Sequence, residues 1–306
     1  MQIIQELNAD STQVERATIA LGTFDGLHLG HQSIIRTAVR LARQTGGPAT
    51  VFTFSSHPAQ TLDPLHCPPM LLSYEDKVSL LADWGVDILC QVPFSEAFSQ
   101  LSPEAFIAFL QTHFAPTAVV VGSNYTYGRF GAGTCRSLQQ AGLENDFRVV
   151  VKELVVQNGQ TASSTAIREL IAVGRVKTAA ALLGRQYHLT GQVVNGDGRG
   201  RQLGFPTANV AVPENLLLPG DGVYAVNIVA CGKRMAGMAS IGSNPTFDIG
   251  ERRFEIHLLD WEGDLYGCRI VVQFVERLRD MIRFSSPEDL VAQLETDRLQ
   301  VKALLS

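Results

Sequence analysis

The chain has 306 residues, of which 45% are hydrophobic and 18% are charged, and its formal net charge at pH 7 is -5. This length allows two domains of ordinary size, and the composition is that of a protein folded nearly throughout. A negative net charge with mixed signs excludes a protein that coats nucleic acid through a broad basic surface, although local basic groups can still bind a nucleotide.

The five cysteines are scattered and never form a close pair with metal-ligand spacing, so we expect reduced core residues. No run approaches the roughly 18 apolar residues of a membrane span, and the first residues lack the pattern of a signal peptide. We therefore expect a cytoplasmic protein with neither a membrane nor a nucleic acid as partner. The sequence carries no signal that predicts an oligomeric state.

Up to about residue 184, short apolar runs alternate with amphipathic stretches, which is typical of an α/β domain with a parallel sheet covered by helices. The β-branched-rich runs predict strands at residues 17–21, 49–54, 87–92 and 118–121, and a longer one at 147–156. Capping signals and apolar periodicity predict helices from near His31 to Gly46, from Ser73 onward, and at residues 165–173 and 176–183.

From about Gln186 the pattern changes, because turn glycines become frequent and strands alternate in hydrophobicity, for example at residues 223–229 and 254–259. This pattern predicts a small antiparallel β domain. A final helix is expected after Ser286, with Pro287 in its first turn.

A glycine-containing segment, residues 22–31, lies between the first predicted strand and the first predicted helix. Ligands of an open parallel sheet bind beyond the carboxyl ends of its strands, where backbone amides and a helix N-terminus can approach phosphate. His28 and His31 can donate hydrogen bonds to phosphate oxygens and stabilise charge that builds up on phosphorus. Two isolated histidines would more often be a helix cap and a surface residue, but the glycines and the position favour a phosphate site. Its candidate ATP-binding residues are Gly22, Phe24, Asp25 and Gly26, with His28 and His31 as candidate catalytic residues.

Two other segments are expected near the same rim of the sheet. Residues 122–129 follow another predicted strand and include Asn124. Residues 163–168 stand at a predicted helix start and offer hydroxyls and a guanidinium. Alone they would be a helix cap, but together with free amides these groups suit a departing pyrophosphate. The candidate residues of this segment are Ser163, Ser164, Thr165 and Arg168.

With these motifs in place, the chain resembles the bacterial bifunctional riboflavin kinase and FAD synthetase family along essentially its whole length. Gly-x-Phe-Asp-Gly-x-His-x-Gly-His at residues 22–31, the His57-Pro58 pair, Gly122-x-Asn124 and residues 163–168 are similar to that family's adenylyltransferase module. The resemblance implies a Rossmann-like nucleotidyltransferase domain that converts FMN and ATP to FAD and pyrophosphate. The attacking FMN phosphate is already an anion and needs no general base, so the protein has only to orient it and screen charge.

The resemblance also implies individual roles. Residues expected to bind or activate ATP in the first domain are His28, His31, Asn124, Ser163, Ser164, Thr165 and Arg168. Residues expected to bind flavin are His57, Pro58, Tyr125 and, in the second domain, Arg279.

The β domain contains a glycine-rich segment at 196–200, which alone is equally well interpreted as a hairpin, and then Gly204-Phe-Pro-Thr-Ala-Asn209. Thr207 and Asn209 are two apart in an extended stretch, so their oxygen-bearing side chains point the same way and can hold a magnesium ion that bridges ATP phosphates. Glu255 is the carboxylate that we choose as general base, because a hydroxyl nucleophile must lose its proton. In isolation, Glu255 would be interpreted as an exposed strand residue.

Gly204-Phe-Pro-Thr-Ala-Asn209, followed by Glu-x-His-Leu-Leu-Asp and Asp-Leu-Tyr-Gly, looks like the riboflavin kinase module. The resemblance implies a small six-stranded β-barrel that transfers the γ-phosphoryl group of ATP to the 5′-hydroxyl of riboflavin. Gly204 would bind ATP, Thr207 and Asn209 the metal, and Glu255 would be the base. The expected cofactor is Mg²⁺ with ATP, while riboflavin, FMN and FAD are substrates and products. We expect an adenylyltransferase domain at 1–184 and a riboflavin kinase domain at 185–306.

Two other functions would use parts of the same motifs. One is a nucleotidyltransferase for another phosphorylated acceptor, with the β domain as a specificity module; residues 204–209 and Glu255 argue against it. The other is a flavin-binding or riboflavin-sensing protein without turnover, which would not need His28, His31, Thr207, Asn209 and Glu255 intact.

Overall fold

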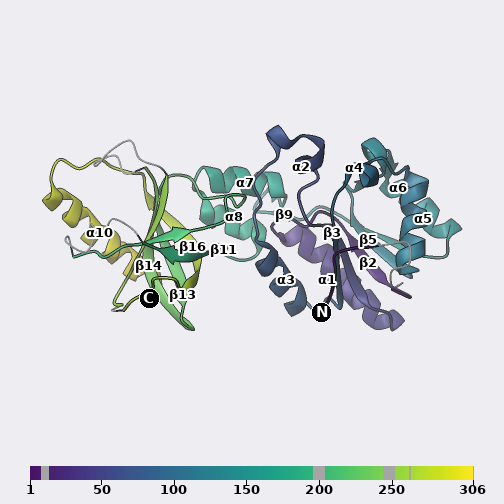
Figure 1. The fold of residues 1–306 in the computed structure, drawn as a ribbon, viewed down its shortest axis with the longest axis horizontal. Helices are drawn as coiled ribbons and strands as arrows, with labels where there is room; N and C mark the ends of the chain where they lie inside the picture. The colour runs from purple at the N-terminus through teal and green to yellow at the C-terminus, as the bar shows by residue number, and fades with distance from the viewer. Residues whose placement is uncertain (8–13, 196–203, 244–251, 262, 306) are drawn as a thin grey trace. The chain divides into compact units, whose positions relative to one another are not determined.

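The computed structural model describes residues 1–7, 14–195, 204–243, 252–261 and 263–305. Residue contacts divide the chain into two compact units, one of Met1–Met70 with Tyr74–Ser163 and the other of Leu71–Ser73 with Ser164–Ser306. Figure 1 shows both units as a ribbon whose colour runs from purple at the N-terminus to yellow at the C-terminus. The glycine-rich segment at 196–200 lies outside the described residues, so neither interpretation of it is tested.

The first unit contains a six-stranded sheet in the order β1-β4-β3-β2-β5-β8, in which neighbours run parallel. Every residue of β2, β4 and β5 is buried, as expected for a parallel sheet covered on both faces. The chain runs outward from β2 to β3 and β4 and then returns to the other side of β2 with β5, so the topological switch point lies between β2 and β5. The strands are β1 (Gln2–Ile4), β2 (Thr18–Leu21), β3 (Ala49–Phe54), β4 (Ile88–Val92), β5 (Ala118–Gly122) and β8 (Arg148–Lys152).

Helices connect these strands. The first, α1, ends at its predicted glycine, because Gly46 adopts φ 72 and its N–H bonds to the carbonyl of Ala42. The helices of this unit are α1 (Leu29–Thr45), α2 (Ala59–Leu62), α3 (Tyr74–Asp83), α4 (Glu96–Ser99), α5 (Pro103–Phe114) and α6 (Cys135–Glu144); two short hairpins pair β6 (Thr126–Tyr127) with β7 (Gly133–Thr134) and β9 (Val156–Gln157) with β10 (Gln160–Thr161).

The predicted strands at 17–21, 49–54, 87–92 and 118–121 are confirmed, and the one at 147–156 is wrong in its second half. There β8 ends at Lys152 and Val156 belongs to the separate β9–β10 hairpin. The reason is that β8 is an edge strand that pairs only with β5, and the last residue of β5, Gly122, is the partner of Lys152. Beyond that pair no backbone of β5 continues the ladder.

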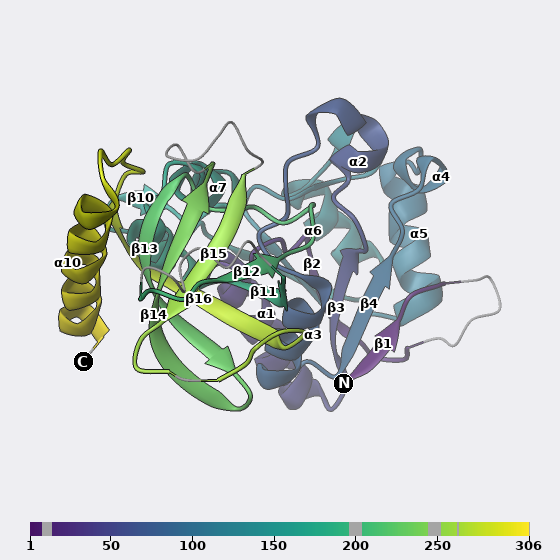
Figure 2. The same ribbon diagram turned by 60° about the vertical axis from the view of Figure 1, so that its left-hand side comes forward.

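The second unit contains a closed antiparallel barrel in the order β11-β12-β15-β14-β13-β16, as predicted for the β domain. Tyr224, Ile256 and Phe274 are fully buried, and Ala225, Met238 and Val301 belong to a second cluster in which α10 packs against the barrel. Figure 2 shows α10 beside β13 and β14. The elements are α7 (Ser164–Ala172), α8 (Val176–Leu183), β11 (Tyr187–Val194), β12 (Ala208–Ala211), β13 (Gly222–Ala230), β14 (Lys233–Gly242), β15 (Arg253–Leu258), β16 (Arg269–Arg279) and α10 (Pro287–Leu305), which confirms the predicted short helices and final helix.

Candidate active sites

The loop after β2 has a strained backbone. Phe24 (φ 48) and Leu27 (φ 46) lie in the left-handed region although both carry side chains, and Gly26 (φ 75) lies between them. The side chains of Phe24 and Leu27 are completely buried, so the core of the unit holds this conformation in place. Close packing also explains Gly22, where a Cβ would lie 3.0 Å from the ring of Phe24. Strain of this kind is concentrated at ligand-binding and catalytic sites.

His28 caps the N-terminus of α1 with its ring. Its Nδ1 accepts the backbone N–H groups of Gly30 at 3.2 Å and of His31 at 3.4 Å. Because Nδ1 is an acceptor, neutral His28 carries its proton on Nε2, which leaves that atom as a donor. The ring of His31 stacks on that of His28, and the rings of Phe24 and His31 form a T-shaped pair with centroids 5.2 Å apart. His28 is therefore both a helix cap and an imidazole donor beside the positive end of α1.

Two segments approach this N-terminus within the first unit. A Cβ on Gly30 would lie 3.6 Å from the carbonyl oxygen of Ala162, so the chain just before Ser163 passes the start of α1. A Cβ on Gly122 would lie 3.1 Å from Oδ1 of Asn124 and 3.5 Å from Ile34 on α1. The structure thus gathers the loop after β2, the loop after β5 and residue 162 at the switch point of the sheet, where ligands of such sheets bind.

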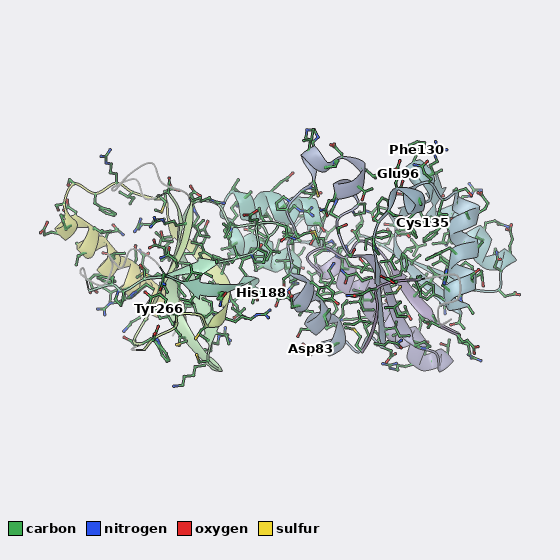
Figure 3. All side chains as sticks on the ribbon, in the orientation of Figure 1. Asp83, Glu96, Phe130, Cys135, His188 and Tyr266 are labelled. Carbon is green, nitrogen blue, oxygen red and sulfur yellow. The ribbon has the colours of Figure 1, made fainter. Side chains whose placement is uncertain are left out.

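The loop after β5 is fixed from the side of α6. Cys135, which Figure 3 labels, donates its thiol to the carbonyl oxygen of Gly122 at 3.2 Å. Tyr125 packs against the core of the first unit and stacks with Tyr127, and burial raises the pKa of its phenol. The backbone around Asn124 is therefore held by packing while Asn124 itself is exposed.

The other first-site candidates lie further along the chain. Nδ1 of His57 accepts the backbone N–H of Ala59 at 3.1 Å, so His57 and Pro58 form the start of α2. Ser164, Thr165 and Arg168 lie in the first turns of α7, which belongs to the second unit.

Sequence reasoning missed one residue next to the first loop, Lys77 on α3. Lys77 and Asp25 are each only 2% exposed. Burial lowers the pKa of the Lys77 ammonium, and the negative charge of Asp25 opposes that shift. A lysine in an amphipathic helix usually faces solvent, so the pattern gave no reason to single it out.

The second site is organised by strand pairing. Asn209 on β12 is directly opposite Glu255 on β15, and Glu255 is directly opposite Ser240 on β14. Directly opposite residues share one face of a sheet, and Thr207 lies two residues before Asn209. The pairing continues from Ser240 to Val223 on β13 and from Val223 to Arg279 on β16. We call these five paired residues, Asn209, Glu255, Ser240, Val223 and Arg279, the barrel row.

Four residues of the barrel row line one pocket of about 130 Å³. Its polar lining includes Thr207, Glu255 and Arg279. Its apolar lining includes residues of the segment after β16 and of α10. The side chains of these two segments that line the pocket are Met281, Ile282, Phe284, Leu290 and Leu294.

His257 also lines this pocket, and it is the second residue that sequence reasoning missed. It holds the segment that carries Thr207. Its Nδ1 lies 2.8 Å from the carbonyl oxygen of Pro206, the residue before Thr207, and so donates to it. Burial lowers the pKa of His257, with the Pro206 contact opposing the shift. The ring therefore fixes the Pro206–Thr207 segment beside β15, where Glu255 lies two residues away on the same face.

The donor set near Thr207 suits one type of metal. In the described ranges, no group of three or more His, Cys, Asp or Glu side chains can hold a metal ion. Mg²⁺ usually takes only one or two protein oxygens and completes its shell with phosphates and water. Thr207 and Asn209 provide two such neutral oxygens on the same face as the Glu255 carboxylate, so this set fits Mg²⁺ bound together with ATP.

Among the described residues, no helix is both long enough and apolar enough to span a membrane.

Comparison with known proteins follows the division of the chain. Residues 10–166 match the family model of FAD synthetase, and residues 183–305 match that of riboflavin kinase. The chain is 38% identical over 290 residues to a bifunctional riboflavin kinase/FMN adenylyltransferase of Listeria monocytogenes, covering 94% of this chain and 92% of that protein. It is 33% identical over 305 residues to the protein of the same name from Escherichia coli, covering 99% and 97%. A crystal structure titled macrolide-efflux protein from Streptococcus pneumoniae superposes with a TM-score of 0.91 at 34% identity, covering 99% of each chain.

Proposed function

Because this chain belongs to the bifunctional riboflavin kinase/FMN adenylyltransferase family, we propose that its two reactions take place at the two separate sites described above. The enzyme phosphorylates riboflavin to FMN with ATP and adenylylates FMN with ATP to give FAD and pyrophosphate. We assign adenylylation to residues 1–184 and phosphorylation to residues 185–306. The kinase family model, which begins at residue 183, supports this boundary.

The kinase assignment rests on one observation, the direct pairing of Asn209 with Glu255. Glu255 accepts the proton of the riboflavin 5′-hydroxyl, which turns a weak nucleophile into one that can attack phosphorus. Thr207 and Asn209 would hold Mg²⁺, and Gly204 would bind the ATP phosphates. When bound, the metal would neutralise negative charge on the phosphate oxygens.

The adenylylation assignment rests on the capped N-terminus of α1. FMN brings its own phosphate anion, so the site has to align it with the α-phosphorus of ATP and to screen charge. The imidazole rings of His28 and His31 and the positive end of the α1 dipole stabilise that charge. Gly22, Phe24, Asp25 and Gly26 shape the loop. We propose Asn124, Ser163, Ser164, Thr165 and Arg168 as further ATP-binding residues and His57, Pro58 and Tyr125 as flavin-binding residues.

The cellular location is also a proposal. All five cysteines are free thiols, which is the state that a reducing cytoplasm maintains. We therefore place the enzyme in the cytoplasm, where its substrates riboflavin, FMN and ATP meet it.

A magnesium titration tests the kinase site. FMN formation from riboflavin is measured at increasing Mg²⁺ with fixed ATP for the parent enzyme and for Asn209→Ala. We expect Asn209→Ala to need several-fold more Mg²⁺ for half-maximal FMN formation, whereas FAD formation from supplied FMN by the same preparation keeps its Mg²⁺ dependence. Unchanged Mg²⁺ dependence of FMN formation in Asn209→Ala contradicts the assignment.

A further inference from the structure

We infer that Asp297, a residue of α10 outside the barrel row, positions Arg279 so that the pocket selects the uncharged carbonyl groups of the flavin ring. This inference rests on the proposed kinase site and adds a specificity residue and a positioning residue to it. It also fixes the direction in which riboflavin lies along the barrel row.

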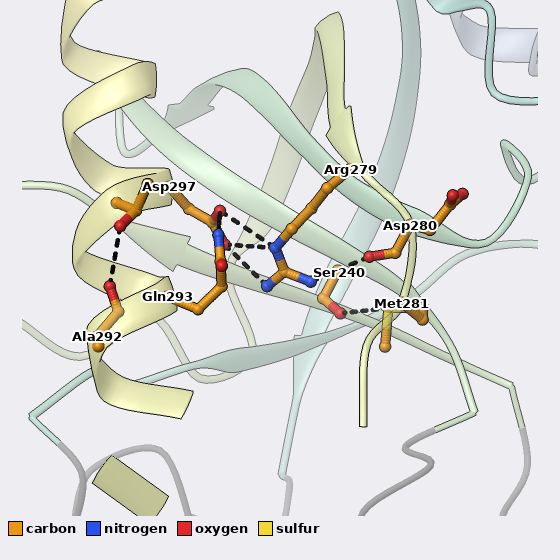
Figure 4. A network of polar contacts seen from close by, with 8 residues as sticks. Ser240, Arg279, Asp280, Met281, Ala292, Gln293 and Asp297 are labelled. Carbon is orange, nitrogen blue, oxygen red and sulfur yellow. Dashed lines mark hydrogen bonds and ion pairs between the residues drawn. The ribbon is translucent and has the colours of Figure 1, made fainter. Parts of the chain in front are cut away.

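Arg279 and Asp297 form a buried pair. Nε of Arg279 donates to both carboxylate oxygens of Asp297 at 3.1 and 3.0 Å, and Nη2 donates to Oδ2 at 2.8 Å. The side chain of Asp297 is only 1% exposed, and that of Arg279 is 14% exposed. Gln293, one turn earlier on α10, donates to Oδ1 of Asp297 at 2.8 Å. Figure 4 shows this network reaching from α10 to the end of β16.

A buried ion pair of this kind contributes little net stability, because desolvation of both charges offsets their attraction. Its geometry has a more specific effect. The bidentate contact fixes the plane of the guanidinium, while Nη1 donates to the carbonyl oxygen of Asp280 at 3.0 Å. A guanidinium has two N–H groups on each Nη, and the contacts found among the described residues use one on each. One donor on each of Nη1 and Nη2 therefore remains to bind a ligand in the pocket.

The charge of the pair decides what those donors bind. Asp297 neutralises Arg279, so the pair attracts a phosphate group much less than a lone arginine would. Two N–H donors held in one plane suit neutral carbonyl oxygens, which the pyrimidine end of the flavin ring carries. The ring of Phe284 lies 5.8 Å from the guanidinium carbon of Arg279, and Leu290 and Leu294 add apolar contacts for a flat aromatic ring.

Spacing along the barrel row allows one ligand to reach both Glu255 and Arg279. Glu255 and Arg279 are separated by three strand steps, through Ser240 and Val223. At about 4.8 Å per step the path along the wall is on the order of 14 Å, and because three of six strands are half the closed barrel, the straight-line separation is shorter. The ribityl chain of riboflavin leaves from the central ring, so its terminal hydroxyl also lies closer to the ring carbonyls than the full length of the molecule. Riboflavin can thus present its terminal hydroxyl to Glu255 and its ring carbonyls to Arg279.

Riboflavin analogues with sulfur in place of one ring carbonyl oxygen test this directly, because thiocarbonyl sulfur is a weaker hydrogen-bond acceptor. We propose to measure the Kd of riboflavin, 2-thioriboflavin and 4-thioriboflavin by fluorescence titration, together with kcat and KM for FMN formation. The parent enzyme should bind at least one thio analogue about tenfold more weakly than riboflavin, the range expected for a charge-assisted hydrogen bond. Equal affinity of the parent enzyme for all three ligands overturns the inference.

Arg279→Lys should fold as the parent does, because lysine still pairs with buried Asp297. Lysine lacks the planar guanidinium, so the variant tests the role of that group. It should bind riboflavin and its thio analogues with similar affinity. Asp297→Asn should raise the KM for riboflavin several-fold, reduce the discrimination and leave kcat within about twofold, because Asp297 acts only through Arg279. Lys302→Gln is the matched control, since it breaks an exposed ion pair of α10 with Asp260 away from the pocket, and it should keep the parent KM and discrimination.

Retention of the parent discrimination by Arg279→Lys overturns the inference, as does a fall in kcat without a change in KM in Asp297→Asn. Either result leaves the proposed kinase site intact provided that Glu255→Gln still abolishes FMN formation. The failure of the inference and the failure of the proposed function are therefore separate observations.

Discussion

The imidazole rings of His28 and His31 are stacked, with centroids 3.6 Å apart and ring planes 25° from parallel. The stack stands on the first turn of α1, and Nδ1 of His28 accepts backbone N–H groups of that turn. His28 thus has a structural role through one nitrogen and, in our proposal, a chemical role through the other. Mutations that separate these two roles test the first site.

His28→Asn should keep the structural role and lose the chemical one. Asparagine is among the best N-cap residues, whereas alanine at an N-cap costs about 1 kcal/mol. We expect FAD formation from FMN to fall by about 10²–10³-fold, as for loss of one charge-stabilising donor. The midpoint of unfolding should stay near that of the parent protein and should fall in His28→Ala. If His28→Asn makes FAD at the parent rate, the ring is only a helix cap.

In Glu255→Gln the rate of FMN formation should fall by about 10²–10⁴-fold, the usual contribution of a general base. The amide keeps the shape of the side chain but cannot accept the proton of the hydroxyl. Glu276→Gln on β16 is the control, because Glu276 pairs with Lys177 and does not line the pocket. Chromatography of FMN at several time points measures the rate. Normal turnover by Glu255→Gln would assign the base to another group.

Lys77 should make the stability of the first unit depend on pH. Burial lowers its pKa in the folded protein below the ordinary 10.5. Between the lowered pKa of the folded protein and 10.5, Lys77 keeps its proton in the unfolded chain but has lost it in the folded protein. The free energy of unfolding therefore rises as the pH rises between these two pKa values. Lys77→Met, of similar length and without charge, should lack this rise. Urea unfolding of both proteins from pH 7 to 10 measures it, and parallel curves would show that Lys77 does not titrate in this way.

Cys231 and Cys268 should differ in reactivity. Their sulfur atoms are 3.8 Å apart, and the hydrogen bond between them is the largest cause of a raised pKa at Cys268. The thiolate is the reactive form, so iodoacetamide at pH 8 should label exposed Cys231 first. In Cys231→Ala the labelling of Cys268 should become faster, because the hydrogen bond is gone. Mass spectrometry of labelled peptides measures both rates, and initial labelling of Cys268 ahead of Cys231 would contradict the prediction.

The strands that were predicted correctly are those whose sequence carries the whole signal. Residues 118–121 form a continuous apolar run, and residues 49–54 are apolar apart from Thr50 and Thr53, because both faces of a parallel strand are buried. The end of β8 at Lys152 could not be predicted, because it depends on where β5 ends. The short strand β1 was missed, since three residues that are mostly exposed carry no periodicity.

The site residues divide in the same way. His28 and Glu255 lie in motifs whose residue types and order are visible in the sequence. The direct pairing of Asn209 with Glu255 depends on strand register, which no local pattern specifies. Asp297 and Lys77 are charged residues on amphipathic helices, where sequence reasoning assigns them to solvent. Only tertiary packing reveals that each is buried beside a functional residue.

Mixing two inactivated variants tests the separation of the two sites most directly. His28→Asn with riboflavin, ATP and Mg²⁺ should accumulate FMN without FAD, and Glu255→Gln should convert supplied FMN to FAD but make neither product from riboflavin. A mixture of both variants should form FAD from riboflavin, because FMN released by one is adenylylated by the other. Loss of both activities in either single variant, with both proteins folded, would contradict the assignment of one reaction to each site.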